Sequence, residues 1–79
     1  MKKQLIKIMA DVFGVSEDAI NEQSSPDNII EWDSLKHMQL IIEIESVFKI
    51  EFPVEAILQS RNFELLIFYI NEVQGNFEQ

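Results

Sequence analysis

Apolar positions near the N-terminus follow the period of an amphipathic helix. They recur at offsets 0, 3, 4, 7 and 8, at Leu5, Ile8, Met9, Val12 and Phe13. Gly14 comes next, where the C-cap of a helix favours a residue that accepts a positive φ. The pattern therefore predicts a helix over residues 3–13.

The same period returns in the middle and near the end of the chain. Residues 34–48 are so apolar that the polar positions form only a narrow stripe, which predicts a central helix beginning at Asp33-Ser34. Pro53 can start a short helix over 54–58, because its fixed φ suits a first turn. Asn62 can cap a last helix over 63–73, and Gly75 lies beyond its end.

Residues 15–33, between the first two helices, lose this period. Ser, Asn, Asp and Pro accumulate there, and Ser25-Pro26 is typical of a cap followed by a first turn. A loop of this length is usually functional. The alternating run 50–52 is too short for a strand of a hairpin. We therefore expect one all-α domain over residues 1–79, a small four-helix bundle of three longer helices and a short third one.

Charge and composition restrict the partners. Six basic and fourteen acidic side chains give a net charge of −8, which repels nucleic acids and anionic membranes and favours basic protein surfaces. The chain has no cysteine, so any thiol chemistry needs a thiol from outside it. The N-terminus lacks the apolar stretch and cleavage site of a signal peptide, and no apolar run is long enough to span a membrane. We expect a cytoplasmic monomer.

Asp33, Ser34 and His37 contain the three residue types of a catalytic triad. They lie within five positions, however, whereas a triad is assembled from separate segments around an oxyanion site. One histidine and scattered carboxylates offer no set of metal ligands. We therefore expect neither catalytic residues nor a metal site.

Ser34 is informative because it opens a helix after a long loop. A hydroxyl there is exposed near free backbone N–H groups, and a phosphoryl group attached to it would be stabilised. The alternative is that Ser34 or Asp33 only caps the helix.

The stretch from Glu31 to Glu45, Glu-Trp-Asp-Ser-Leu-Lys-His-Met-Gln-Leu-Ile-Ile-Glu-Ile-Glu, resembles the Asp-Ser-Leu region of acyl carrier proteins. The likeness extends over nearly the whole chain, through the first helix, the long loop, Phe52-Pro53 and the last helix. It implies a 4'-phosphopantetheine from coenzyme A, attached to Ser34, whose thiol holds cargo as a thioester. Asp33 and Leu35 complete the motif, and Asp33 would assist the modifying enzyme and its magnesium.

The resemblance also assigns roles to residues around Ser34. Five apolar side chains become candidates for an acyl pocket, although they can equally be plain core: Met38, Ile41, Ile42, Ile57 and Leu58. Four polar ones become candidates for partner docking: Glu31, Lys36, Gln39 and Glu43. The implied partners are a phosphopantetheinyl transferase, an acyl- or aminoacyl-adenylating ligase and downstream acyl-processing enzymes. The carrier itself would not be an enzyme.

The chain departs from the commoner fatty-acid carriers just after Asp-Ser-Leu, where they have acidic residues and it has Lys36 and His37. Lys36 is expected to screen the phosphodiester from nearby carboxylates, and His37 to lie at the surface or to be partly packed. Trp32 is expected to bury its ring and anchor the loop. A D-alanyl or other aminoacyl carrier stays open as an alternative, as does an unmodified acidic helical adaptor. Cargo and pathway, whether fatty acid, polyketide or aminoacyl, also stay open.

Overall fold

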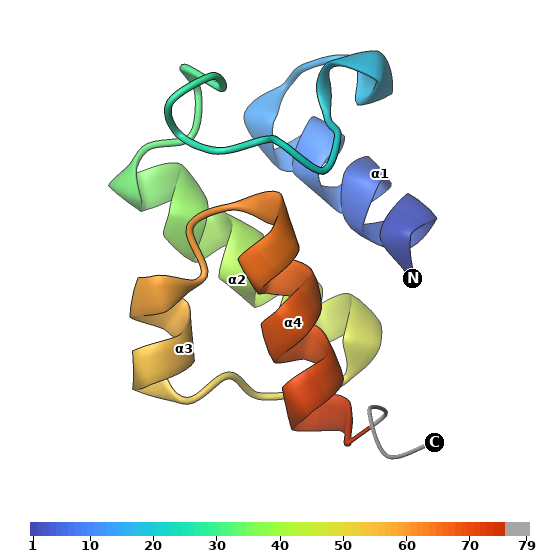
Figure 1. Cartoon of the computed structure of the whole chain (residues 1–79), viewed down its shortest axis with the longest axis vertical. Helices are drawn as coiled ribbons and strands as arrows, with labels where there is room; N and C mark the ends of the chain where they lie inside the picture. Colours follow the sequence, from blue (N-terminus) through green and yellow to red (C-terminus); the bar gives the residue numbers. More distant parts are fainter. Residues whose placement is uncertain (76–79) are drawn as a thin grey trace.

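A computed structural model describes residues 1–75 of the 79-residue chain. Within these described residues, four α-helices follow one another, α1 (Lys2–Phe13), α2 (Ser34–Phe48), α3 (Val54–Gln59) and α4 (Phe63–Gln74), with a single 3-10 turn, η1 (Glu17–Ala19), after α1 (Figure 1). The described residues contain no strand. The predicted all-α bundle with a short third helix is confirmed, and η1 is the one element that the sequence pattern did not predict.

The helices end where local chemistry predicts. Gly14 and Gly75 adopt φ of 70° and 72° at the C-caps of α1 and α4, a conformation that costs a glycine little. Asn62 caps α4, since its side-chain oxygen accepts the N–H of Leu65 at 2.8 Å. Lys49 ends α2 in the same left-handed region, with φ 57°, although no glycine marks that position.

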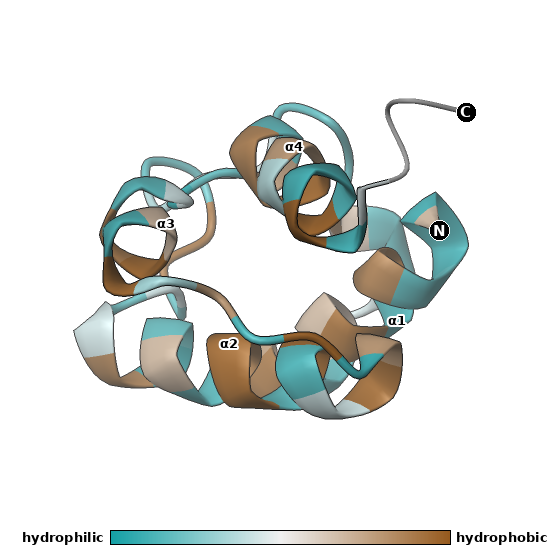
Figure 2. Cartoon of the chain, turned by 90° about the horizontal axis from the view of Figure 1, so that it is seen from below, coloured by the Kyte–Doolittle hydropathy of each residue, from teal (hydrophilic) through white to brown (hydrophobic). Residues whose placement is uncertain are grey.

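One core joins the helices, and α1 packs along α2. Figure 2 shows the four helices around a common interior. Side chains with at most 1% of their surface exposed fill it from α1, α2 and α4: Leu5, Met9, Leu40, Ile41, Ile44, Phe63, Leu66 and Ile70. From α3, Ala56 is buried. Within residues 1–75, no helix is both long and apolar enough to cross a membrane.

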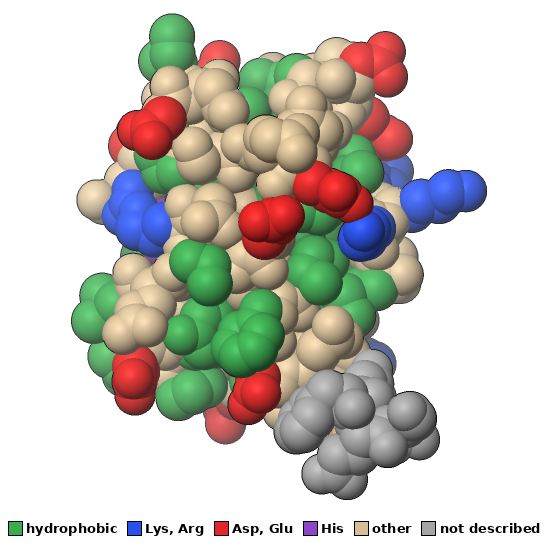
Figure 3. Space-filling model, in the orientation of Figure 1, with side chains coloured by type: hydrophobic (Ala, Val, Ile, Leu, Met, Phe, Trp, Pro, Cys, Tyr) green, Lys and Arg blue, Asp and Glu red, His purple; other side chains and the backbone are tan. Residues whose placement is uncertain are grey.

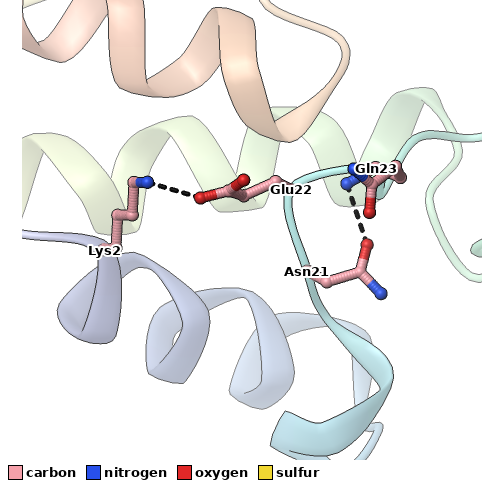
Figure 4. A network of polar contacts seen from close by, with 4 residues as sticks. All are labelled: Lys2, Asn21, Glu22 and Gln23. Atoms are coloured by element: carbon pink, nitrogen blue, oxygen red, sulfur yellow. Dashed lines mark hydrogen bonds and ion pairs between the residues drawn. The ribbon is translucent and has the colours of Figure 1, made fainter.

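The long loop is built from short turns that fix its path. The Ser25 carbonyl accepts the N–H of Ile29 at 2.9 Å, which confirms the turn predicted after Ser25. The Ser24 carbonyl accepts the N–H of Phe63 at 3.0 Å and so ties the loop to the start of α4. Glu22 of the loop forms an ion pair with Lys2 at the start of α1 (Figure 4). This contact holds the pKa of the Glu22 carboxyl below its usual range.

Candidate functional site

Ser34 is the first residue of α2, and its side chain is exposed. Asp33 is the N-cap, because its Oδ1 accepts the N–H of Lys36 at 2.8 Å. Among residues 1–75, the Ser34 hydroxyl has no hydrogen-bond partner. Asp33 therefore caps α2. The Ser34 hydroxyl is free to react, and it lies at the positive end of the α2 dipole.

Trp32 anchors the loop two residues before Ser34. Its side chain is only 2% exposed, and its ring centroid lies 5.2 Å from that of Phe13 in α1. The prediction that Trp32 buries its ring and anchors the loop is confirmed. A buried tryptophan beside an exposed serine fixes the direction from which the chain enters α2.

His37 is buried, with 3% of its surface exposed, so the expectation of a surface or partly packed residue is wrong. Its Nδ1 accepts a hydrogen bond from the Nε1–H of Trp32 at 3.0 Å. Because the indole nitrogen can only donate, the imidazole proton sits on Nε2, which donates to the carbonyl of Ile57 in α3 at 2.8 Å. Both partners lie outside α2, which is why the spacing of residues within the helix gave no sign of them.

Burial lowers the pKa of His37 below its ordinary value of 6.5, because it penalises the charged ring. The hydrogen bond to the Ile57 carbonyl opposes this shift, whereas the positive charge of Arg61 adds to it. The ring is therefore neutral at pH 7. Since both nitrogens are engaged with Trp32 and Ile57, His37 is not placed to activate Ser34 as a base.

Lys36 is half-buried, and its Nζ donates to the carbonyl of Val12 at 3.2 Å. That carbonyl belongs to the last turn of α1, where backbone acceptors lack partners within the helix and a cation is favourable. The contact gives Lys36 a role within the fold. Its screening of a phosphodiester on Ser34 stays a prediction.

The acyl-pocket candidates do not share one environment. Ile41 is 1% exposed in the core and Ile57 is half-buried, whereas Met38, Ile42 and Leu58 are 44%, 60% and 69% exposed. The last three, together with Leu35 at 66%, place apolar surface on α2 and α3. Figure 3 shows hydrophobic side chains reaching the surface over α3 and α4, with acidic groups around them.

The polar docking candidates Glu31, Gln39 and Glu43 are all exposed. Two hollows of about 260 and 330 Å³ lie elsewhere on the molecule. The first is lined by Lys2, Glu22, Phe63, Glu64 and Ile67, and the second by Gln4, Lys7, Ile8, Asp11, Glu43 and Val47. Neither is lined by an acyl-pocket candidate. In the part of the chain that the structure describes, no cluster of His, Asp and Glu could hold a metal ion.

The family model for the phosphopantetheine attachment site matches residues 3–70. The chain belongs to the acyl carrier protein family. It is 32% identical over 72 residues to an acyl carrier protein of Rubrobacter xylanophilus, a match that covers 91% of this chain and 89% of that protein. It is also 35% identical over 74 residues to "Non-reducing polyketide synthase AC" of Didymella fabae. That match covers 91% of this chain but only 3% of the synthase.

Members of this family are not themselves catalytic, and they carry 4'-phosphopantetheine covalently. The group supplies the thiol that this chain lacks. Ser34 fits it, because the hydroxyl is exposed, has no partner among residues 1–75 and stands at a helix N-terminus that favours a phosphodiester. The Ser34 side chain is thus suited to the attachment.

Proposed function

We propose that this carrier holds an acyl or aminoacyl group as a thioester on 4'-phosphopantetheine attached to Ser34. One observation carries the proposal: Asp33 supplies the cap of α2, which leaves the exposed Ser34 hydroxyl without a structural task. In the attachment, the Ser34 oxygen attacks the pantetheine-bearing phosphorus of coenzyme A. The pyrophosphate bond breaks, the adenosine half leaves, and the hydroxyl proton passes to a base of the transferase.

Three neighbours of Ser34 prepare it for this step. Trp32 and His37 fix the entry of the chain into α2, and Asp33 holds the first turn. One carboxylate oxygen of Asp33 caps the helix, and the other is proposed to face the magnesium of the transferase. The acidic side chains of the loop are proposed to steer the carrier towards basic surfaces on its partners.

The exposed apolar side chains of α2 and α3 are proposed to contact the cargo. Leu35, Met38 and Ile42 lie at offsets 0, 3 and 7, and so share one face of α2 that begins beside Ser34. Burying part of an acyl chain against such a surface stabilises it by about 0.8 kcal/mol per methylene. The proposed pocket therefore opens from this exposed face, with Ile41 and Ile57 as its floor.

The proposed partners are a phosphopantetheinyl transferase, an adenylating ligase that loads the thiol, and cytoplasmic enzymes that process the cargo. A second candidate, a D-alanyl or other aminoacyl carrier, is favoured by the residues after the motif. Lys36 and His37 take the place of the acids found in the commoner fatty-acid carriers. Both side chains make hydrogen bonds to other segments of the chain.

The test is the intact mass of the protein after incubation with coenzyme A, magnesium and a transferase of broad specificity. We expect the wild type to gain one phosphopantetheine and Ser34→Ala to gain none. A folded wild type that gains no mass, while a known carrier is modified in the same tube, would contradict the proposal and favour the acidic adaptor. A gain on Ser34→Ala would move the site to another residue.

A further inference from the structure

The imidazole of His37 lies between three segments of the chain. It belongs to α2, accepts a hydrogen bond from Trp32 in the loop before Ser34, and donates one to the Ile57 carbonyl of α3. The two rings lie nearly in parallel, with centroids 6.1 Å apart and planes at 24°, which suits the in-plane hydrogen bond between them. One buried side chain thus joins α3 to the loop that presents Ser34.

Helix α3 has few other means of holding its position. It is six residues long, has no side-chain hydrogen bond at its N-cap, and packs on the core through the buried Ala56 and the half-buried Ile57. A helix this short is unstable by itself, so its place depends on contacts with the rest of the fold. A second hydrogen bond joins α3 to another helix, from Tyr69 Oη to Gln59 Oε1, and it is 3.0 Å long and exposed. The hydrogen bond from His37 to Ile57 is part-buried and is therefore better shielded from water than the one from Tyr69.

We propose that His37 is a positioning residue that couples α3 to the presentation of Ser34. The inference rests on the proposed function, in which Ser34 is modified and α3 contacts the cargo. A movement of α3 passes through the His37 ring to Trp32, and from there to the residues that enter α2. Breaking this link lowers the fraction of molecules in which Ser34 is correctly presented.

Substitutions distinguish the effect of the two His37 hydrogen bonds from the effect of side-chain packing. His37→Leu removes both hydrogen bonds and keeps an apolar side chain, whereas His37→Gln keeps an acceptor and a donor in one group. Ile70→Val, in the core part of α4, is the control for a general loss of stability. All variants are compared well below their unfolding midpoints.

The first measurement is the dependence of the transferase rate on carrier concentration. We expect His37→Leu to raise KM about tenfold with little change in kcat, because only correctly presented molecules bind productively. His37→Gln should recover most of this loss, and Ile70→Val should match the wild type. Trp32→Phe should raise KM by a smaller factor in the His37→Leu background than in the wild type, because the two changes remove the same hydrogen bond.

The second measurement needs no cofactor. The chain has one tryptophan, so the indole N–H of Trp32 gives a single NMR signal. Ala56→Gly destabilises α3, because a glycine inside a helix loses more conformational freedom on folding than an alanine. We expect it to shift the indole signal in the presence of His37 and to leave it unmoved in the His37→Leu background.

The inference fails if a folded His37→Leu variant has the KM of Ile70→Val, or if Ala56→Gly shifts the indole signal equally in both backgrounds. Failure of the proposed function looks different: the wild type then gains no phosphopantetheine, and the NMR measurement still tests the link between α3 and Trp32.

Discussion

The ammonium group of Lys36 donates a hydrogen bond to the carbonyl of Val12, which joins the first turn of α2 to the last turn of α1. Lys36→Met keeps most of the side-chain stem and removes the donor. We expect the free energy of unfolding to fall by about 1 kcal/mol, measured by urea denaturation. Lys36→Arg, which keeps a donor, should lose less.

A third variant, Lys36→Glu, tests the other role predicted for Lys36. If the lysine screens a phosphodiester on Ser34, Lys36→Glu should slow the transferase or change partner selectivity. Unchanged values for both would leave Lys36 with its structural role alone.

Asp33 and Ser34 should respond differently to substitution, because only Asp33 caps α2. Asp33→Ala is expected to lower the free energy of unfolding by about 1 kcal/mol, whereas Ser34→Ala should leave it within about 0.5 kcal/mol of the wild type. Asp33→Asn preserves a capping oxygen but not the charge. It should therefore keep stability and slow modification, which thermal unfolding and intact mass would show together. A Ser34→Ala variant as unstable as Asp33→Ala would contradict the assignment of the cap to Asp33 alone.

His37 makes stability depend on pH. Folding lowers the pKa of His37 below the 6.5 of the free side chain, so between the two values the unfolded state binds more protons than the folded one. The contribution of His37 is complete above pH 6.5 and is lost as the pH falls towards the lower, folded pKa. The positive charge of Arg61 acts on the ring in the same direction.

The measurement is the urea midpoint between pH 5 and pH 8 for the wild type and His37→Gln, which does not titrate. The difference between the two proteins isolates His37 from the many carboxylates. We expect the wild type to lose its advantage as the pH falls through and below 6.5. A difference that stays constant with pH would show that the His37 pKa is not lowered by folding.

Ile41 and Ile42 are adjacent but should behave as opposites. Ile41 is 1% exposed and Ile42 is 60% exposed. Ile41→Ala is expected to lower the free energy of unfolding by about 2–4 kcal/mol, through lost burial and the cavity left behind. Ile42→Ala should change it by less than about 0.5 kcal/mol, and should instead weaken contact with an acyl cargo if the proposed pocket is correct. Similar losses of stability for both would contradict the exposure of Ile42.

The sequence by itself determined where the helices begin and end, and it predicts Ser34 as the residue for attachment. Gly14, Asp33 and Asn62 act on backbone groups within a few residues of themselves, so their effects can be predicted without a fold. The periodic apolar positions likewise require an amphipathic helix whatever it packs against. The Asp-Ser-Leu motif and its surroundings indicated the carrier family.

Only the tertiary structure decided how the side chains around Ser34 are used. The groups to which His37 and Lys36 donate are backbone carbonyls 20 and 24 residues away, and every residue has a carbonyl, so no residue type in the sequence marks them. The central helix is apolar almost all round, and its period could not tell the buried Ile41 from the exposed Ile42. Burial at such positions depends on which helix lies opposite, and that is settled by packing over long distances in the chain.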